Sequence, residues 1–304
     1  MTKKGKLKER HHWWPECLSE HWCEADGQIN VIRSIGDPFR TKPVNAGVIG
    51  NGHIIKLGGG KPSPWDESFE HVFDQADSAF PKVVTWLEGL DRQPTNPGSP
   101  HSSRFLPQPI TGEQFAGLVE GIVSLGVRSP MFRVSAVAPA VYFHGDLSPD
   151  KRHQLEALNM RHCQRMIADA CKASGKIAVL YAGDGEFIFG DGFYNTATGV
   201  SAPPLSPRML VPLTPKIAVL YTRPIAFATE PRLVTLVLDA DEVAAQNAVL
   251  QVYAKDFLFY RSKKPTIHDH FLTAKHLECS DNNNPVDAIA RSLPGVRSRH
   301  PLFS

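Results

Sequence analysis

Apolar residues change their spacing along this 304-residue chain, and the change limits the folds that it can adopt. Within 65–90, 112–125 and 149–174 they recur at the spacing of an amphipathic helix. From residue 177 onward they stand in short runs that are typical of strands. Helices and strands are thus segregated along the chain, and we predict an α+β fold: an irregular N-terminal β-hairpin region, a helical middle, and a C-terminal mixed or antiparallel sheet with a covering helix.

Proline, threonine and glycine mark the ends of the helices in the middle region. Pro81 lies inside the first helical segment and should kink or split it. Thr111 is placed to cap the second helix, and Pro149 and Gly175 suit the first turn and the end of the third. Between the first two helices, the proline-rich segment 92–109 predicts a long loop and a subdomain seam. The acidic residues expected to form a solvated helix face are Glu67, Glu70, Asp74 and Asp77.

The predicted C-terminal sheet rests on a series of short apolar runs. The turn signal Gly183-Asp184-Gly185 follows the first run and predicts a hairpin with 186–189. Asp239 is placed to cap the covering helix over 240–253. The runs are 177–181, 209–211, 217–221, 233–238 and 257–260.

We divide the chain into four regions on these patterns, within the one large or two small domains that its length allows. Residues 1–62 form the aromatic β-hairpin region and 63–175 the mainly helical region. Residues 176–261 form the mixed sheet, and 262–304 form a polar tail that we expect to be partly disordered.

Charge and cysteine usage narrow the classes of function. The 33 basic and 31 acidic residues give a formal net charge of +2, which does not favour nucleic-acid or membrane binding by the whole chain. The five cysteines form no C-x-x-C pair, so we expect reduced thiols in a cytoplasmic protein rather than disulfides or a structural zinc site. No apolar stretch approaches the length that spans a bilayer, and the basic N-terminus lacks the apolar run of a signal peptide.

The segment His11-His12-Trp13-Trp14-Pro15 holds the main candidate site residues. It follows a basic arm, ending at Arg10, which either contacts phosphate or remains a solvated terminus. The turn signal Asp26-Gly27 predicts a hairpin between this segment and the alternating strand 28–33. Because adjacent strand residues face opposite ways, one of the two histidines should face a pocket or solvent.

This His-His-x-x-Pro motif, with Arg40-Thr41-Lys42-Pro43-Val44-Asn45, resembles the start of a bacterial family known only as a domain of unknown function. Phe189-Gly190-Asp191-Gly192 and Pro204-Leu205-Ser206-Pro207 resemble the family's late Ser/Thr-Asp-Asn-Pro and Pro-Leu-Ser-Pro motifs, and 241–260 resembles its closing helix and strand. The resemblance covers most of 8–260 and implies a mobile-element or defence setting, without an activity to carry over. Gly192-Phe193 departs from the family's Asn-Pro, so the resemblance implies no role for that turn.

The first functional hypothesis is a metal-dependent nucleic-acid hydrolase of the His-Me finger kind. The His-His-x-x-Pro motif resembles the first strand of such a site, and Asn45 and His53 resemble its Asn…His pair. On this resemblance His12 activates water and Asn45 orients its imidazole. His53, with His11 as a further candidate, then ligates one Mg²⁺ or Mn²⁺. The residues expected to contact nucleic acid are Arg10, Trp13, Trp14 and Lys56.

Two alternatives to the nuclease stay open. The metal ligand of such a motif lies on a helix, whereas Gly47, Gly50 and Gly52 would each cost about 1 kcal/mol in a helix interior, so we predict a loop here. The segment can instead be a packed aromatic hairpin in which a histidine accepts an indole N–H. It can also belong to a non-catalytic module that binds a nucleotide, a single strand or a protein, with the tryptophans stacking on bases.

Two further groups of side chains invite a metal or acid–base reading. Asp184, Glu186 and Asp191 lie around two tight turns, where carboxylates bind Mg²⁺ or act as acid and base, but where aspartate more often caps its own backbone. The second group, for which we expect no metal site, is His268, His270 and His276 in the predicted tail.

Overall fold

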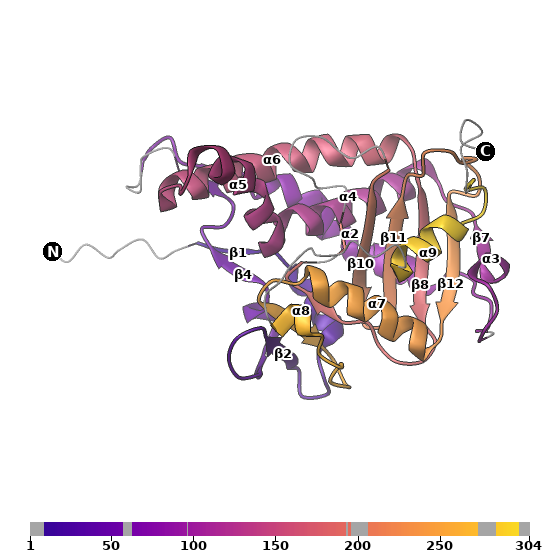
Figure 1. Ribbon diagram of the computed structural model, residues 1–304. Coiled ribbons are helices and arrows are strands. Elements are labelled where there is room, and N and C mark those ends of the chain that lie inside the picture. The colour runs from indigo at the N-terminus through magenta and orange to yellow at the C-terminus, as the bar shows by residue number, and fades with distance from the viewer. Residues whose placement is uncertain are drawn as a thin grey trace.

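The computed structural model describes residues 9–56, 63–95, 97–192, 194–195, 206–272 and 284–297. It has the mixed α+β architecture that the sequence predicts, with small antiparallel sheets near the N-terminus, a helical middle and a five-stranded mixed sheet towards the C-terminus (Figure 1). The predictions made for the basic arm up to residue 8, for Pro204 and Leu205, and for His276 lie outside the described residues.

A mixed sheet forms the centre of the C-terminal half. Its strand order is β10 (Arg208–Thr214), β11 (Ile217–Thr222), β8 (Lys176–Ala182), β12 (Leu233–Leu238) and β7 (Leu106–Gln108). β8 and β12 are parallel, and the other neighbours are antiparallel. Every residue of β8 and β11 is buried, which explains why both strands are continuous apolar runs. The predicted hairpin between 177–181 and 186–189 is wrong, because β11 and β12 occupy both edges of β8.

Helices cover both faces of this sheet. Tyr181 of β8 and Tyr221 of β11 project from one face, as their antiparallel register requires. The Tyr181 hydroxyl donates to the carbonyl of Leu87, and the Tyr221 hydroxyl donates to that of Ser174 at 2.7 Å. These carbonyls lie at the C-terminal ends of α2 (His71–Glu88) and α6 (Pro149–Ala173). α7 (Ala240–Tyr253) and α9 (Pro285–Ser292) cross the opposite face (Figure 1).

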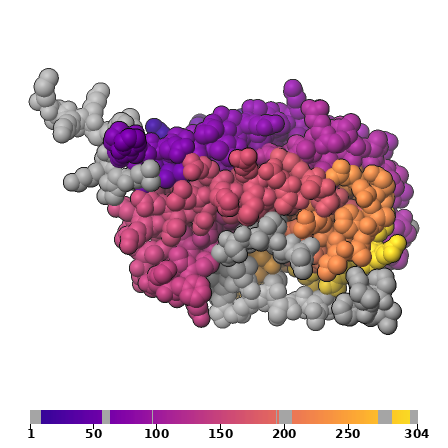
Figure 2. All heavy atoms as spheres, turned by 90° about the horizontal axis from the view of Figure 1, so that it is seen from above, coloured from indigo at the N-terminus to yellow at the C-terminus, as the bar shows by residue number. Residues whose placement is uncertain are grey.

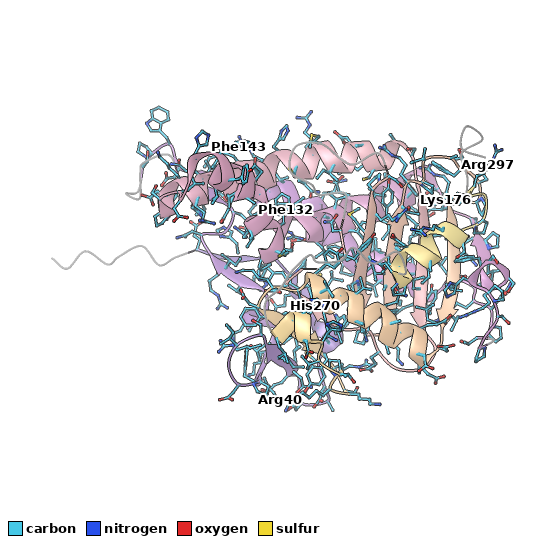
Figure 3. The ribbon with its side chains drawn as sticks, in the orientation of Figure 1. Arg40, Phe132, Phe143, Lys176, His270 and Arg297 are labelled. Atoms are coloured by element: carbon cyan, nitrogen blue, oxygen red, sulfur yellow. The ribbon has the colours of Figure 1, made fainter. Side chains whose placement is uncertain are left out.

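The helices predicted for the middle region form, and a further one joins them. α2 runs through Pro81 without being split, and α4 (Gly112–Arg128) begins with a capping box in which the Thr111 hydroxyl accepts the N–H of Gln114 at 3.1 Å. The unpredicted helix α5 (Pro130–His144) starts directly afterwards, at a proline in its first turn. Its Phe132 is buried, whereas Phe143 is 76% exposed (Figure 3). Seen from above, the pink atoms of α6 form a band across the surface of the protein (Figure 2).

A four-stranded antiparallel sheet joins segments from both ends of the chain. Its order is β3 (Phe39–Thr41), β2 (Ile29–Arg33), β13 (Phe257–Tyr260) and β9 (Phe189–Gly190). The predicted hairpin between the tryptophan segment and β2 is wrong: β1 (Arg10–His12) pairs instead with β4 (Val48–Gly50), because both edges of β2 are taken by β3 and β13.

The remaining elements are short. They are α1 (Glu16–Ser19), the 3₁₀ helices Glu20–Trp22 and Pro43–Asn45, the paired strands β5 (Ile54–Ile55) and β6 (Glu67–Ser68), α3 (His101–Arg104) and α8 (Asp269–Leu272). The proline-rich segment 92–109 thus contains α3 and β7 within the predicted loop. Among the described helices, none is by itself long and apolar enough to cross a membrane, and α4 with α5 qualifies only as a pair bent by 64°.

Candidate functional site

The paired strands β1 and β4 separate the two adjacent histidines. Their register sets His11 opposite Ile49 and His12 opposite Val48. His11 is 1% exposed, whereas His12 is half-buried and its backbone carbonyl accepts a hydrogen bond from Arg128 at 3.4 Å. Because side chains alternate along a strand, His11 is the histidine that points into the fold.

His11 meets a second histidine and a carboxylate, which we call the histidine cluster (His11, His53 and Glu70). The ring centroids of His11 and His53 are 5.0 Å apart. Glu70, at the N-terminal end of α2, places its Oε2 3.4 Å from His11 Nε2 and its Oε1 4.0 Å from His53 Nδ1. The predicted solvated acidic face is therefore only partly correct, since the half-exposed Glu70 side chain also faces two imidazoles.

His53 is held neutral by its surroundings. It is 1% exposed, and its ring contacts those of Phe69 and Phe73 at centroid distances of 5.7 and 5.0 Å. Burial, followed by the positive charges of Arg128 and Arg133, lowers the pKa of His53 to about 2. Neither ring nitrogen has a hydrogen-bond partner among the described residues. Buried polar atoms are rarely left unpaired, so the ring nitrogens of His53 are an unusual feature of this core.

The two arginines beside His53 differ in how their charge is balanced. Arg128 binds both carboxylate oxygens of Asp77, at 2.6 and 2.9 Å. Arg133 is 7% exposed and donates to the carbonyl of Gly52 at 3.2 Å, but within the described chain its Nε has no partner and its guanidinium forms no ion pair. Burial lowers the pKa of Arg133 to about 10, while the negative charge of the half-buried Glu156 acts in the opposite direction. In the sequence, Arg133 stands as a lone charge within an apolar stretch, which is only a weak indication of a functional residue.

The other residues predicted for the nuclease site are dispersed. The side-chain oxygen of Asn45 accepts from Arg10 at 2.9 Å, and no hydrogen bond joins Asn45 to His12 within the described chain. Lys56 is half-buried after β5. Trp13 and Trp14 are 4% and 0% exposed, so their rings would have to leave the core to stack on a base.

The tryptophans pack instead with aromatic residues from far along the chain. The Trp14 ring is stacked on Phe189 at 4.3 Å and lies 4.7 Å from Phe259 and 6.0 Å from Trp22. The indole nitrogens of Trp14 and Trp22 have no partner among the described residues. The tryptophans are thus buried among aromatic side chains, as that alternative expects, but they form no hairpin with β2 and no histidine accepts the indole N–H of Trp14 or Trp22.

The histidine cluster falls short of a metal centre as it stands. Two imidazoles and a carboxylate are ligands that several divalent ions accept. However, no group of three or more His, Cys, Asp or Glu side chains in the described part of the chain is arranged to hold a metal ion. The residues do not fit Mg²⁺ or Mn²⁺ in this geometry, so we assign no chemical step to a metal, and the predicted ion stays a prediction.

The C-terminal carboxylates do not converge on one another. Asp184 is exposed, and Glu186 binds Arg261 and the backbone N–H of Ser262 at 3.1 Å. Asp191 is fully buried and accepts the backbone N–H groups of Lys255 and Asp256 at 2.6 and 2.8 Å. Burial raises the pKa of Asp191 to about 6. Asp191 therefore fastens β9 to the loop before β13, a distant segment, and its hydrogen bonds are not those of an aspartate that caps its own turn.

Within the described residues, the thiols and the tail histidines form no metal or catalytic centre of their own. Cys17, Cys23, Cys163 and Cys171 are free, and burial raises the pKa of Cys17 to about 11, so its thiol is unreactive near neutral pH. In the described tail, His270 donates its backbone N–H to His268 Nδ1 at 3.2 Å, with stacked rings. This contact is local and brings no carboxylate or thiol to the pair.

The comparisons with known proteins leave the chain without an assigned relative. No family model matches it. No curated protein and no solved structure matches it either. The resemblance to a bacterial family of unknown function therefore stays a prediction, and the function is argued from the site alone.

Proposed function

We propose that this protein acts on a phosphate ester of a nucleotide or nucleic acid, bound where Arg133 approaches the histidine cluster. The observation that carries the proposal is the buried guanidinium of Arg133, which forms no ion pair within the described chain, although the half-buried Glu156 carboxylate is near enough to raise its pKa. A buried charge that no carboxylate binds directly is costly. Guanidinium matches phosphate well, and a bound phosphate would supply a direct ion pair together with acceptors for the unpartnered Nε of Arg133 and ring nitrogens of His53.

The chemistry that we propose is hydrolysis with His11 as the general base. A carboxylate beside an imidazole orients the ring, and Glu70 Oε2 lies 3.4 Å from His11 Nε2. His53, which stays neutral, would donate a hydrogen bond to the phosphate. This assignment moves the base from His12 to His11, because Asn45 binds Arg10 instead of a histidine.

Cleavage of labelled single-stranded DNA, double-stranded DNA and RNA tests this proposal, in EDTA and in Mg²⁺ or Mn²⁺. We expect His11→Ala to lower the rate by about 100-fold or more, as loss of a general base does. His71→Ala, at an exposed histidine of α2, is the matched control and should cleave like the wild type. Equal cleavage by all three proteins, or none by the wild type, contradicts the hydrolase. Activity that needs Mg²⁺ or Mn²⁺ would restore the metal hypothesis.

A non-catalytic binding function is the second candidate. It is favoured by the burial of both imidazoles, at 1% exposure each, which keeps them from a polymeric substrate in this conformation. Fluorescence anisotropy with labelled oligonucleotides at several salt concentrations would separate the two functions. Binding that weakens with salt and is reduced in Arg133→Gln, without any cleavage, supports a binding module over a hydrolase.

A further inference from the structure

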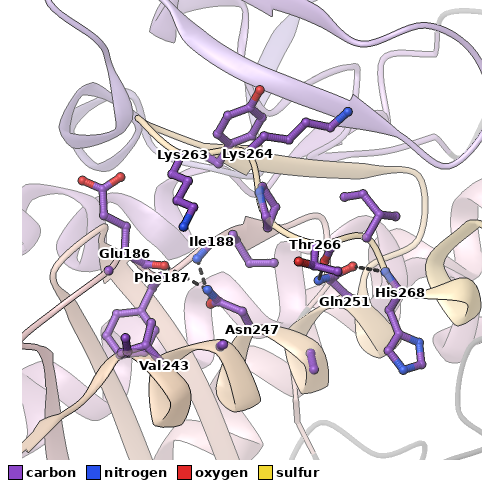
Figure 4. Close-up of a pocket in the computed structure, with 17 residues that line it drawn as sticks. Glu186, Phe187, Ile188, Val243, Asn247, Gln251, Lys263, Lys264, Thr266 and His268 are labelled. Carbon is purple, nitrogen blue, oxygen red and sulfur yellow. Dashed lines mark hydrogen bonds between the residues drawn. The ribbon is translucent and has the colours of Figure 1, made fainter.

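A cavity of about 330 Å³, separate from the histidine cluster, lies against α7 (Figure 4). Its walls are α7, the turn and following residues 185–188, and the segment 263–268 that follows β13. We call it the α7 pocket. Apolar side chains dominate its lining: Phe187, Ile188, Val243, Ala244, Ala248 and Ile267.

Two amides on α7 fasten the walls of the α7 pocket. Asn247 accepts the backbone N–H of Ile188 at 3.0 Å and donates to the carbonyl of Glu186 at 2.9 Å. One turn further along, Gln251 donates to the carbonyl of Thr266 at 2.8 Å and accepts the N–H of His268 at 2.7 Å (Figure 4). Each amide thus binds one wall through both its nitrogen and its oxygen. The pocket is therefore pre-formed, as ligand pockets usually are.

The charges around the α7 pocket are unequal. Glu186 is the acidic residue of the lining, and it is already bound by Arg261 and Ser262. Lys263 and Lys264 form no ion pair with any described residue. Figure 4 shows Lys263 extending from its wall across the pocket towards Ile188 and Asn247, while Lys264 points away from α7. The pocket therefore presents an apolar floor and one inward-directed ammonium group.

We propose that the α7 pocket binds a small organic anion, with its apolar body against α7 and its carboxylate or phosphate at Lys263. The volume stands at the lower end of the range for small-molecule pockets, which suits a ligand smaller than a dinucleotide. The amides of Asn247 and Gln251 are occupied, and Lys263 is the inward-directed charged group of the lining that no described residue pairs with. An uncharged apolar compound would leave this ammonium unpaired, and a polar one would leave the apolar floor uncovered.

Calorimetric titration of the full chain with octanoate, octyl phosphate and octanol tests the site. We expect both anions to bind at least about tenfold more tightly than octanol, because a charge-assisted hydrogen bond is worth more than a neutral one. Lys263→Gln should remove this preference, and Lys264→Gln, the matched control, should keep it. Tighter binding of octyl phosphate indicates a phosphate monoester as the natural class, and tighter binding of octanoate indicates a carboxylate.

Filling the α7 pocket gives an independent check. Ala244 is exposed and lines the pocket, so Ala244→Phe should block all three compounds without disturbing the core. Its unliganded melting temperature should match that of the wild type; if the variant fails to fold, the Lys263→Gln comparison decides. Equal affinity for octanol and the anions in the wild type, or no binding of any of them at millimolar concentration, overturns the proposal.

Discussion

At the scale of single residues, Gly47 controls how the N-terminal aromatic core closes. It has a φ of +65°, and a Cβ added there would lie 2.5 Å from the Cβ of Trp14. Gly27 also has a positive φ, of +74°, but open space around it. We expect Gly47→Ala to lower the free energy of unfolding by about 3 kcal/mol and Gly27→Ala by only about 1 kcal/mol. Urea denaturation of both variants measures the difference, and equal losses would show that the Trp14 contact relaxes freely.

The lowered pKa of His53 predicts that this single residue makes the stability of the protein depend on pH. Its pKa is lowered to about 2 in the folded protein, far below its value in an unfolded chain. Above about pH 6.5 His53 is neutral in both states and does not reduce the free energy of unfolding. Below about pH 6.5 only the unfolded chain protonates His53, so the free energy of unfolding falls by about 1.4 kcal/mol per pH unit. We expect wild type to lose about 2 kcal/mol relative to His53→Phe between about pH 7 and pH 5. Urea denaturation of both proteins at about pH 7 and pH 5 measures the difference, and equal losses in the two proteins would contradict it.

At the scale of elements, a buried ion pair fastens α2 to α4. Arg128 of α4 is 1% exposed and is bound by Asp77 of α2 through both oxygens. Asp77→Ala leaves this guanidinium unpaired and should cost about 3 kcal/mol. The exposed pair Arg161–Glu67 is the control, and Glu67→Ala should cost less than about 1 kcal/mol. Thermal unfolding measures both. If Arg128→Met with Asp77→Ala is no more stable than Asp77→Ala alone, unpaired charge is not the cause.

The elements show which part of the fold is encoded locally. Helices α4 and α7 begin where Thr111 and Asp239 predict, because a cap is satisfied by residues only three positions away. Strands β8, β11 and β12 also lie at their predicted apolar runs. The pairing of these strands could not be predicted from the same patterns. The composition of a strand indicates that it is buried, but the strands that pair with it depend on which strand edges remain free in the folded chain.

At the scale of the whole molecule, the two ends of the chain share one core. Trp14 packs on Phe189 and Phe259, and β2 near the N-terminus pairs with β13. We expect full-length protein to unfold in one transition, with the same midpoint by tryptophan fluorescence and by far-UV circular dichroism. A fragment 1–175 should show solvent-exposed tryptophan emission, because it lacks Phe189 and Phe259. Separate midpoints, or a fragment with buried tryptophans, would show independent domains.

The candidate site was predictable only in part. The sequence singled out His11 and His53, which the structure brings to a 5.0 Å ring distance. It did not indicate Glu70 or Arg133, because an acidic residue on a helix and a lone arginine in an apolar segment have common structural explanations. It also joined Asn45 to His12, whereas Asn45 binds Arg10. Distances of tens of residues separate these positions along the chain, and no local pattern specifies such contacts.

The sequence alone determined the α+β class, helices α2, α4, α6 and α7, and strands β8, β10, β11 and β12, because propensity, capping and periodicity act over a few residues. It did not predict α5 or β7, and it placed 257–260 in the C-terminal sheet, whereas this strand, β13, pairs with β2 and β9. Only the tertiary structure decided that His11 is buried while His12 is half-buried, that β1 pairs with β4, and that Arg133 forms no ion pair beside His53 within the described chain. It also decided that residues 185–188 and 263–268 enclose a pocket with α7. Such features depend on which buried surfaces and strand edges find each other, which is a property of the folded chain as a whole.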